Sequence, residues 1–122
     1  MIIPEFLLKR IYKPGSLRII EEGIAIDLKN MLGTGVISGI SFVEINGIKY
    51  PAEALKLITS GIETIASQIS ESNPVVFRMH QEGTLVLKGV NSLKEGINKI
   101  ILELFNKDAG KIQVCLNEKY SA

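Results

Sequence analysis

"VISGISFVEINGIKYP", residues 36–51, contains the strongest local signal for the fold. Two apolar runs, 36–45 and 48–51, flank the dipeptide Asn46-Gly47. Asn-Gly is typical of a two-residue hairpin turn, because both central residues of a type I′ turn need a positive φ. Gly39 interrupts the first run and predicts a β-bulge. The stretch therefore predicts two antiparallel strands joined by a tight turn.

Short apolar runs that end in turn-forming residues recur along the rest of the chain. In the run 24–29, Ile24, Ile26 and Leu28 alternate with Ala25, Asp27 and Lys29, which predicts one buried and one solvated face. The other predicted strands cover residues 6–12, 17–20, 74–82, 83–89, 97–105 and 111–118.

Residues 52–72 allow two interpretations. Ile62, Ile65, Ala66 and Ile69 have helical spacing, whereas the β-branched side chains and the turn formers at both ends favour strands. We expect short strands with one short helical turn near 62–69, and the alternative of a helix stays open.

The strand count and spacing predict an all-β fold, an antiparallel β-sandwich of the jelly-roll or immunoglobulin-like kind with about eight or nine short strands. A length of 122 residues predicts a single domain over 1–122. Leu85 and Leu87 are expected to point into its core, and Leu93 is expected to close one end of it.

Composition excludes several classes of partner. The chain has 14 Lys and Arg against 13 Asp and Glu, so it lacks the basic excess that nucleic-acid binding needs. It has one cysteine, Cys115, which cannot form an internal disulfide and is expected to pack as a small apolar residue. No signal peptide and no run of about 20 apolar residues is visible, so the sequence predicts a cytoplasmic protein without a membrane span.

Apolar residues make up 46% of the chain, and the mean hydropathy is +0.24. One interpretation is an isoleucine-rich β core. The other is that apolar surface is buried against a larger enzyme subunit or a second copy, because a small domain has much surface for its volume. Many isoleucines and lysines with few glutamines also indicate a heat-adapted source.

Arg78, His80 and Glu82 would project from one face of the predicted strand 74–82. They form either a polar patch that binds a ligand or an ordinary solvated face. His80 is the only histidine that could act as the base for a serine nucleophile, and no G-x-S-x-G elbow occurs. His80 and Glu82 could supply two metal ligands, but no clear third ligand lies nearby in the sequence. The inventory therefore predicts no metal, no cofactor and no self-sufficient enzyme.

Three segments resemble the small β subunit of bacterial C-glycoside deglycosidases. They are "YKPGSLRIIEEGIAIDLKN" (12–30), "VEINGIKYP" (43–51) and "NPVVFRMHQEGTLVLKGVNSLKEGINKIILEL" (73–104). Asn98 stands where that family has a histidine after the glycine corresponding to Gly96. The resemblance implies a β-sandwich that does not catalyse alone and binds a larger, metal-dependent barrel subunit that acts on a glycoside.

The leading hypothesis is therefore a non-catalytic accessory subunit of a larger, sugar-processing enzyme. The alternative is a stand-alone homo-oligomeric module that binds a small ligand such as a carbohydrate. A third hypothesis is a hydrolase or isomerase that uses Glu and His side chains at a subunit interface.

Overall fold

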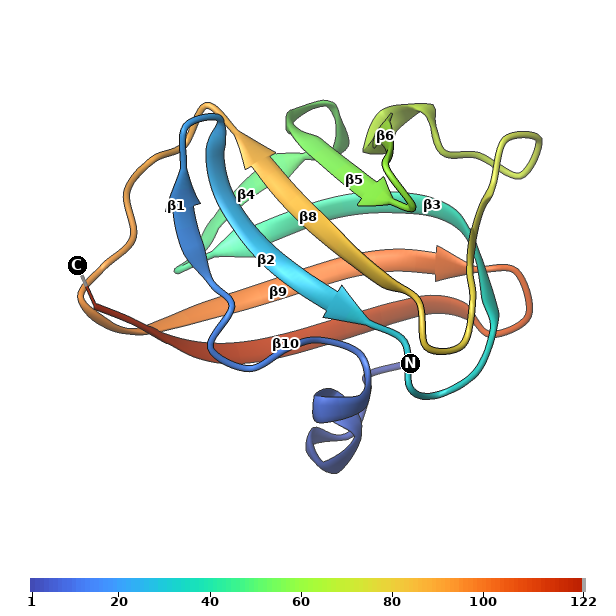
Figure 1. The fold of residues 1–122 in the computed structure, drawn as a ribbon, viewed down its shortest axis with the longest axis horizontal. Helices are drawn as coiled ribbons and strands as arrows, with labels where there is room; N and C mark the ends of the chain where they lie inside the picture. The colour runs from blue at the N-terminus through green and yellow to red at the C-terminus, as the bar shows by residue number, and fades with distance from the viewer. Residues whose placement is uncertain (122) are drawn as a thin grey trace.

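The computed structural model describes residues 1–121, which fold into two antiparallel β-sheets packed face to face (Figure 1). We call them the β2–β8 sheet, with strand order β1-β2-β8-β5-β6, and the β9–β10 sheet, with strand order β10-β9-β3-β4 and β7 paired to β3. In Figure 1 the strands of the two sheets cross obliquely. The predicted all-β sandwich is confirmed.

The described residues form ten strands and three 3₁₀ turns, so the predicted number of strands was slightly low. The strands are β1 Arg18–Ile20, β2 Gly23–Lys29, β3 Gly35–Ile45, β4 Ile48–Pro51, β5 Leu55–Thr59, β6 Ile62–Ile65, β7 Val75–Phe77, β8 Glu82–Lys88, β9 Gly96–Asn106 and β10 Gly110–Tyr120. The 3₁₀ turns are η1 Glu5–Arg10, η2 Ala52–Ala54 and η3 Ala66–Gln68. No helix in this part of the chain is long and apolar enough to span a membrane.

The hairpin at Asn46-Gly47 forms as predicted, with φ of 51° and 89° at the two turn residues. Asn98, which is fully buried, holds it in place. Its Oδ1 accepts hydrogen bonds from Asn46 Nδ2 at 2.9 Å and from the Lys94 N–H at 3.0 Å, and its Nδ2 donates to the Lys94 carbonyl at 2.8 Å. One buried amide therefore joins the turn to the loop that precedes β9.

The core lies between the sheets and is made of the inward-facing side chains of both. Leu85 and Leu87 of β8 pair with Leu57 and Leu55 of β5, and all four are buried. Leu93 packs against the same cluster from the loop before β9, as predicted. Alternation along the strands places these residues on one face, and burying each large aliphatic side chain contributes about 1.5–3 kcal/mol.

The first predicted strand, 6–12, is wrong, because these residues form η1 instead. Pro4 precedes the turn, its carbonyl accepts the Leu7 N–H at 3.0 Å, and the Leu8 carbonyl accepts the Ile11 N–H at 3.1 Å. Leu8 and Ile11, three residues apart, pack against the core. Proline is compatible with the start of a helical turn, and the spacing of three suits a 3₁₀ turn better than a strand.

Residues 52–72 form the expected short strands β5 and β6 with a helical turn at η3. The expected wet face of β2 needs one correction. Ala25 lies on the outer face of the β2–β8 sheet but is fully buried, because its short side chain lies between its cross-strand neighbours Arg18 and Val86.

Candidate functional site

The outer face of the β9–β10 sheet contains a group of apolar side chains. Strand register places Ile101 between Cys115 and Glu44, Ile97 opposite Lys119, and Phe42 opposite Glu103. These positions alternate with the inward-facing core residues, so they face away from the β2–β8 sheet. Ile97 is the most exposed of them, at 53%. We call Phe42, Ile97, Ile101 and Cys115 the docking face.

Lysines lie among and beside the apolar side chains of the docking face. The same register places Lys49, Lys99, Lys111 and Lys119 on this side of the sheet, against two carboxylates, Glu44 and Glu103. Lys49 Nζ lies 4.5 Å from the centre of the Phe42 ring. The outer face of this sheet is therefore apolar in part and has an excess of positive charge.

Glu103 is held in this face by its neighbours. The Gln113 amide donates to its carboxylate at 3.1 Å and, together with a hydrogen bond from Ser41 and the nearby Lys111, lowers the pKa of Glu103, while burial opposes that shift. The carboxylate is therefore stabilised as an anion in the folded protein.

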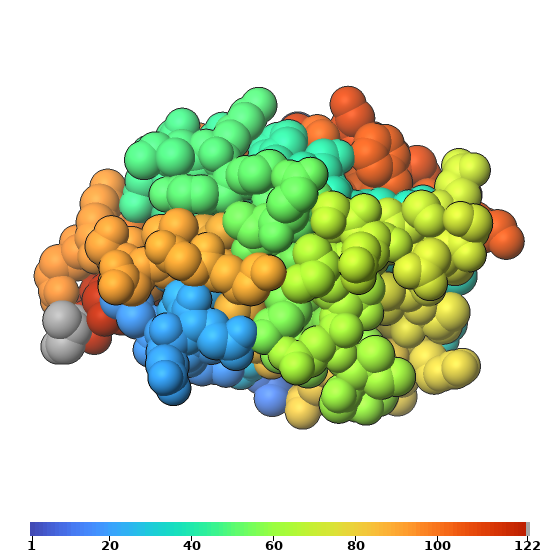
Figure 2. Space-filling model, turned by 90° about the horizontal axis from the view of Figure 1, so that it is seen from above, coloured from blue at the N-terminus to red at the C-terminus, as the bar shows by residue number. Residues whose placement is uncertain are grey.

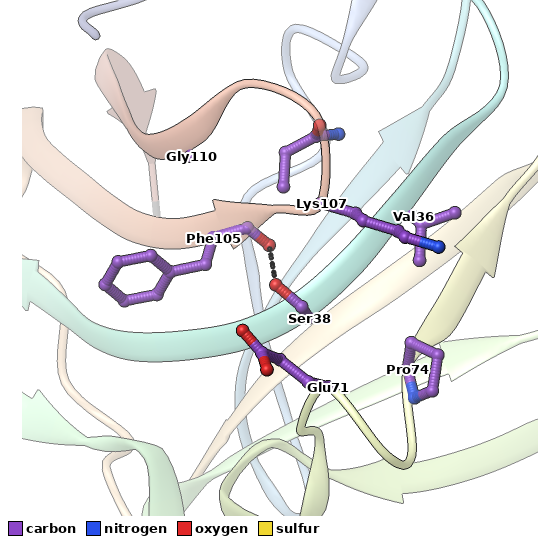
Figure 3. Close-up of a pocket in the computed structure, with 8 residues that line it drawn as sticks. Val36, Ser38, Glu71, Pro74, Phe105, Lys107 and Gly110 are labelled. Carbon is purple, nitrogen blue, oxygen red and sulfur yellow. Dashed lines mark hydrogen bonds between the residues drawn. The ribbon is translucent and has the colours of Figure 1, made fainter.

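A hollow of about 430 Å³ opens where β9 turns into β10 (Figure 3). Loop 70–74 and the β9–β10 hairpin lie at the same end of the molecule in both views (Figure 1; Figure 2). The hollow is lined by Val36, Ser38, Glu71, Pro74, Phe105, Asn106, Lys107 and Gly110. Three segments that are distant in sequence therefore form one surface site.

The side of the hollow formed by the β9–β10 hairpin is fixed by hydrogen bonds. Ser38 Oγ donates to the Phe105 carbonyl at 3.4 Å, and the Lys107 N–H donates to the Val36 carbonyl at 2.9 Å. Asn106 Oδ1 accepts the backbone N–H groups of two hairpin residues at 2.9 Å each. This local side-chain to backbone bonding is what favours a turn at this point.

The opposite side of the hollow is a tight loop. Ser70 and Asn73 exchange backbone hydrogen bonds at 3.2 and 3.1 Å, and Asn73 Nδ2 donates to the Gln68 carbonyl at 2.9 Å. The loop thus presents Glu71 from a closed turn. Figure 3 shows the Glu71 carboxylate directed toward Ser38, and the Lys107 side chain extended beside Val36.

The structure does not place Arg78, His80 and Glu82 on one strand face, so the predicted strand 74–82 is wrong. β7 ends at Phe77 in one sheet, β8 begins at Glu82 in the other, and the residues between them form a turn. His80 has a φ of 69°, its N–H donates to the Asn30 carbonyl at 2.7 Å, and Gln81 Oε1 accepts the Arg78 N–H at 2.8 Å. These hydrogen bonds stabilise the turn relative to a continuous strand.

The three residues also differ in their surroundings. Glu82 pairs with Lys13 at 2.6 Å, and this hydrogen bond lowers the pKa of Glu82. Arg78 lines a separate shallow hollow beside β6, whereas Glu82 lines one on the outer face of the β2–β8 sheet. Their part in ligand binding stays a prediction.

Glu71, Phe105 and Lys107 are not among the site residues predicted from the sequence. The segments "SESNP" (70–74) and "NKDAG" (106–110) are visible in the sequence, but only as turns. Nothing in their spacing indicates that the two turns meet. Within residues 1–121 no group of three potential metal ligands is present.

The geometry defines an all-β sandwich domain with an outer sheet face that combines apolar side chains and lysines, and with a surface hollow lined by apolar, polar and charged residues. Residues 7–120 match the family model described as hydroxymethylglutaryl-CoA reductase, N-terminal domain. Because the match covers most of the 122 residues, the chain belongs to this family. A search of curated protein sequences finds no significant match to the chain.

Proposed function

We propose that this domain is a non-catalytic accessory β-sandwich that associates with a larger enzyme through its docking face. The main support is the group of apolar side chains at Phe42, Ile97, Ile101 and Cys115 on the outer face of a regular sheet. Interfaces combine apolar side chains with polar ones, and on this face Lys99 lies between Ile97 and Ile101 on β9, so charged and apolar side chains alternate.

The charge of the docking face indicates which charge the matching surface of the partner should have. Four lysines against two glutamates favour a partner whose matching surface has an acidic rim. Such complementarity mainly increases the association rate and the specificity, so binding is expected to weaken as salt rises.

Two observations bear on the partner's chemistry. The family description names the N-terminal domain of a reductase, which is one part of a larger protein. The segments that resemble C-glycoside deglycosidase β subunits favour a metal-dependent, sugar-processing partner. The proposal requires a larger enzyme in either case, so the partner must be identified by its own sequence.

The test compares two isoleucine variants. Ile97→Glu puts a negative charge on the docking face, and Ile62→Glu puts one on β6 of the other sheet, where the side chain is 65% exposed. The chain is used to capture proteins from extracts of its own cells, the captured enzyme is identified by mass spectrometry, and the pair is reconstituted from pure components. We expect Ile97→Glu to weaken the reconstituted complex at least about tenfold and Ile62→Glu to have little effect.

The alternative function is a stand-alone homo-oligomer. Light scattering on the pure chain separates the two, because a stable homo-oligomer that captures no larger enzyme would contradict the accessory role. Equal loss of binding in both isoleucine variants would contradict the assignment of the docking face.

A further inference from the structure

We propose that the hollow between loop 70–74 and the β9–β10 hairpin binds a neutral sugar ring. This site involves none of the residues that the sequence suggested, and it goes beyond the accessory function. It uses Glu71, Lys107 and Phe105 as its main contacts.

The aromatic contact comes from Phe105, which is 39% exposed. One side of its ring packs over Gly39, where a Cβ would lie 3.6 Å from the ring Cδ2. Cross-strand pairing of Phe105 with Gly39 thus fixes the ring, and Figure 3 shows the ring at the side of the hollow opposite the Lys107 ammonium. The face of an aromatic ring is electron-rich, so it attracts the weakly positive C–H groups on the apolar face of a pyranose.

The polar contacts match hydroxyl groups. The Glu71 carboxylate accepts hydrogen bonds, the Lys107 ammonium donates them, and the Ser38 hydroxyl does both. A sugar hydroxyl also donates and accepts, so hydroxyls at different positions of one ring can bond to the carboxylate on one side and to the ammonium on the other. Hydrogen bonds to ionised groups are stronger than those between neutral groups. They would compensate for the small apolar area that a sugar can bury.

The charges select against ionic ligands. A carboxylate and an ammonium line the same hollow, so an anion such as phosphate meets the carboxylate of Glu71 and a cation meets the ammonium of Lys107. A neutral polar ligand satisfies both. The remaining class that could do so is a zwitterion such as a free amino acid, which the experiment includes as a probe.

The size and rigidity of the hollow also suit a small ligand. Its volume of about 430 Å³ lies within the range of ligand sites, about 300–1,000 Å³. Loop 70–74 and the hairpin are each held by internal hydrogen bonds, so little ordering cost is expected on binding.

The experiment is an NMR titration of the ¹⁵N-labelled full chain with methyl β-D-glucopyranoside, methyl β-D-galactopyranoside and methyl α-D-mannopyranoside, and separately with glycine. We expect at least one glycoside to shift the backbone amides of Ser38, Glu71 and Lys107 with a millimolar Kd. Absence of shifts with all three glycosides, or shifts with glycine alone, would overturn the proposal.

Variants then test the contacts. Glu71→Ala is expected to weaken binding of the shifting glycoside about tenfold, and Glu71→Gln to restore part of it, since an amide still accepts hydrogen bonds. Glu53→Ala, at an exposed glutamate of η2, is the matched control and should leave the Kd unchanged. Equal effects of Glu71→Ala and Glu53→Ala would contradict the site. The titration needs no partner protein, so its failure would leave the accessory function standing.

Discussion

The outer faces of the two sheets use their charges differently. On the β2–β8 sheet the charges bond to one another. Asp27 Oδ1 accepts a hydrogen bond from the Arg18 guanidinium at 3.1 Å and one from the Thr84 hydroxyl at 3.0 Å. Lys56 forms salt bridges with both Glu22 and Glu63. The hydrogen bonds of these salt bridges raise the pKa of Lys56, with Glu22 contributing most.

On the β9–β10 sheet the outer face has four lysines against two glutamates around an apolar group. When the charges of a face form salt bridges with one another, the face needs no partner to balance them. A face with an excess of one charge favours binding to a protein surface of the opposite charge. The difference in charge therefore favours the β9–β10 sheet as the side through which the proposed partner binds.

The largest expected effect concerns backbone packing and differs between the sheets. A Cβ on Gly23 of β2 would lie 1.9 Å from the Leu87 carbonyl oxygen, so Gly23→Ala must separate β2 from β8. We expect a loss of about 3 kcal/mol in unfolding free energy, measured by urea denaturation.

Gly39→Ala is the matched substitution in the β9–β10 sheet. There the added Cβ makes an ordinary 3.6 Å contact with Phe105, so a change within about 0.5 kcal/mol is expected. Similar losses in both variants would show that the close approach at Gly23 is not what distinguishes the two sheets.

The next effect concerns Asn98, the buried amide beside the docking face. Asn98→Ala leaves the Lys94 N–H and the Asn46 amide without their partner, and an unsatisfied buried group costs about 1–3 kcal/mol. We expect a smaller loss than for Gly23→Ala, about 2 kcal/mol, in the same denaturation experiment. Asn91→Ala, at an exposed loop position, is the control. A loss no larger than that of the control would refute the structural role of Asn98.

The smallest effect is a pH dependence. The folded protein lowers the pKa of Glu103, chiefly through the Gln113 hydrogen bond, relative to about 4.3 for an unfolded glutamate. The resulting stability is present above the unfolded pKa and is lost as pH falls through the folded pKa. Glu103→Gln should therefore lose less stability than the parent protein on acidification from about pH 6 to about pH 3. A steeper acid loss in Glu103→Gln would contradict this sign.

Much of the fold could be predicted because the relevant signals are local. The positive φ values that Asn46-Gly47 supplies and the alternation of Ile24, Ile26 and Leu28 both act within a few residues. The prediction failed at 6–12 and 74–82, where Pro4 and the Gln81 side chain stabilise turns that apolar periodicity does not reveal.

The hollow could not be predicted for a different reason. Glu71 and Lys107 line the same hollow only because β3 pairs with both β7 and β9, which brings loop 70–74 and the β9–β10 hairpin to one end of the sandwich. Strand pairing between distant segments depends on the whole core, and a single sequence does not contain that information in its local patterns.

The most direct measurement is the mass of the reconstituted complex by light scattering, with the parent chain, Ile97→Glu and Ile62→Glu compared at the same concentration. We expect a defined complex with a larger enzyme for the parent chain and for Ile62→Glu, and loss of that complex for Ile97→Glu. A complex that survives Ile97→Glu unchanged would contradict the docking face on the β9–β10 sheet.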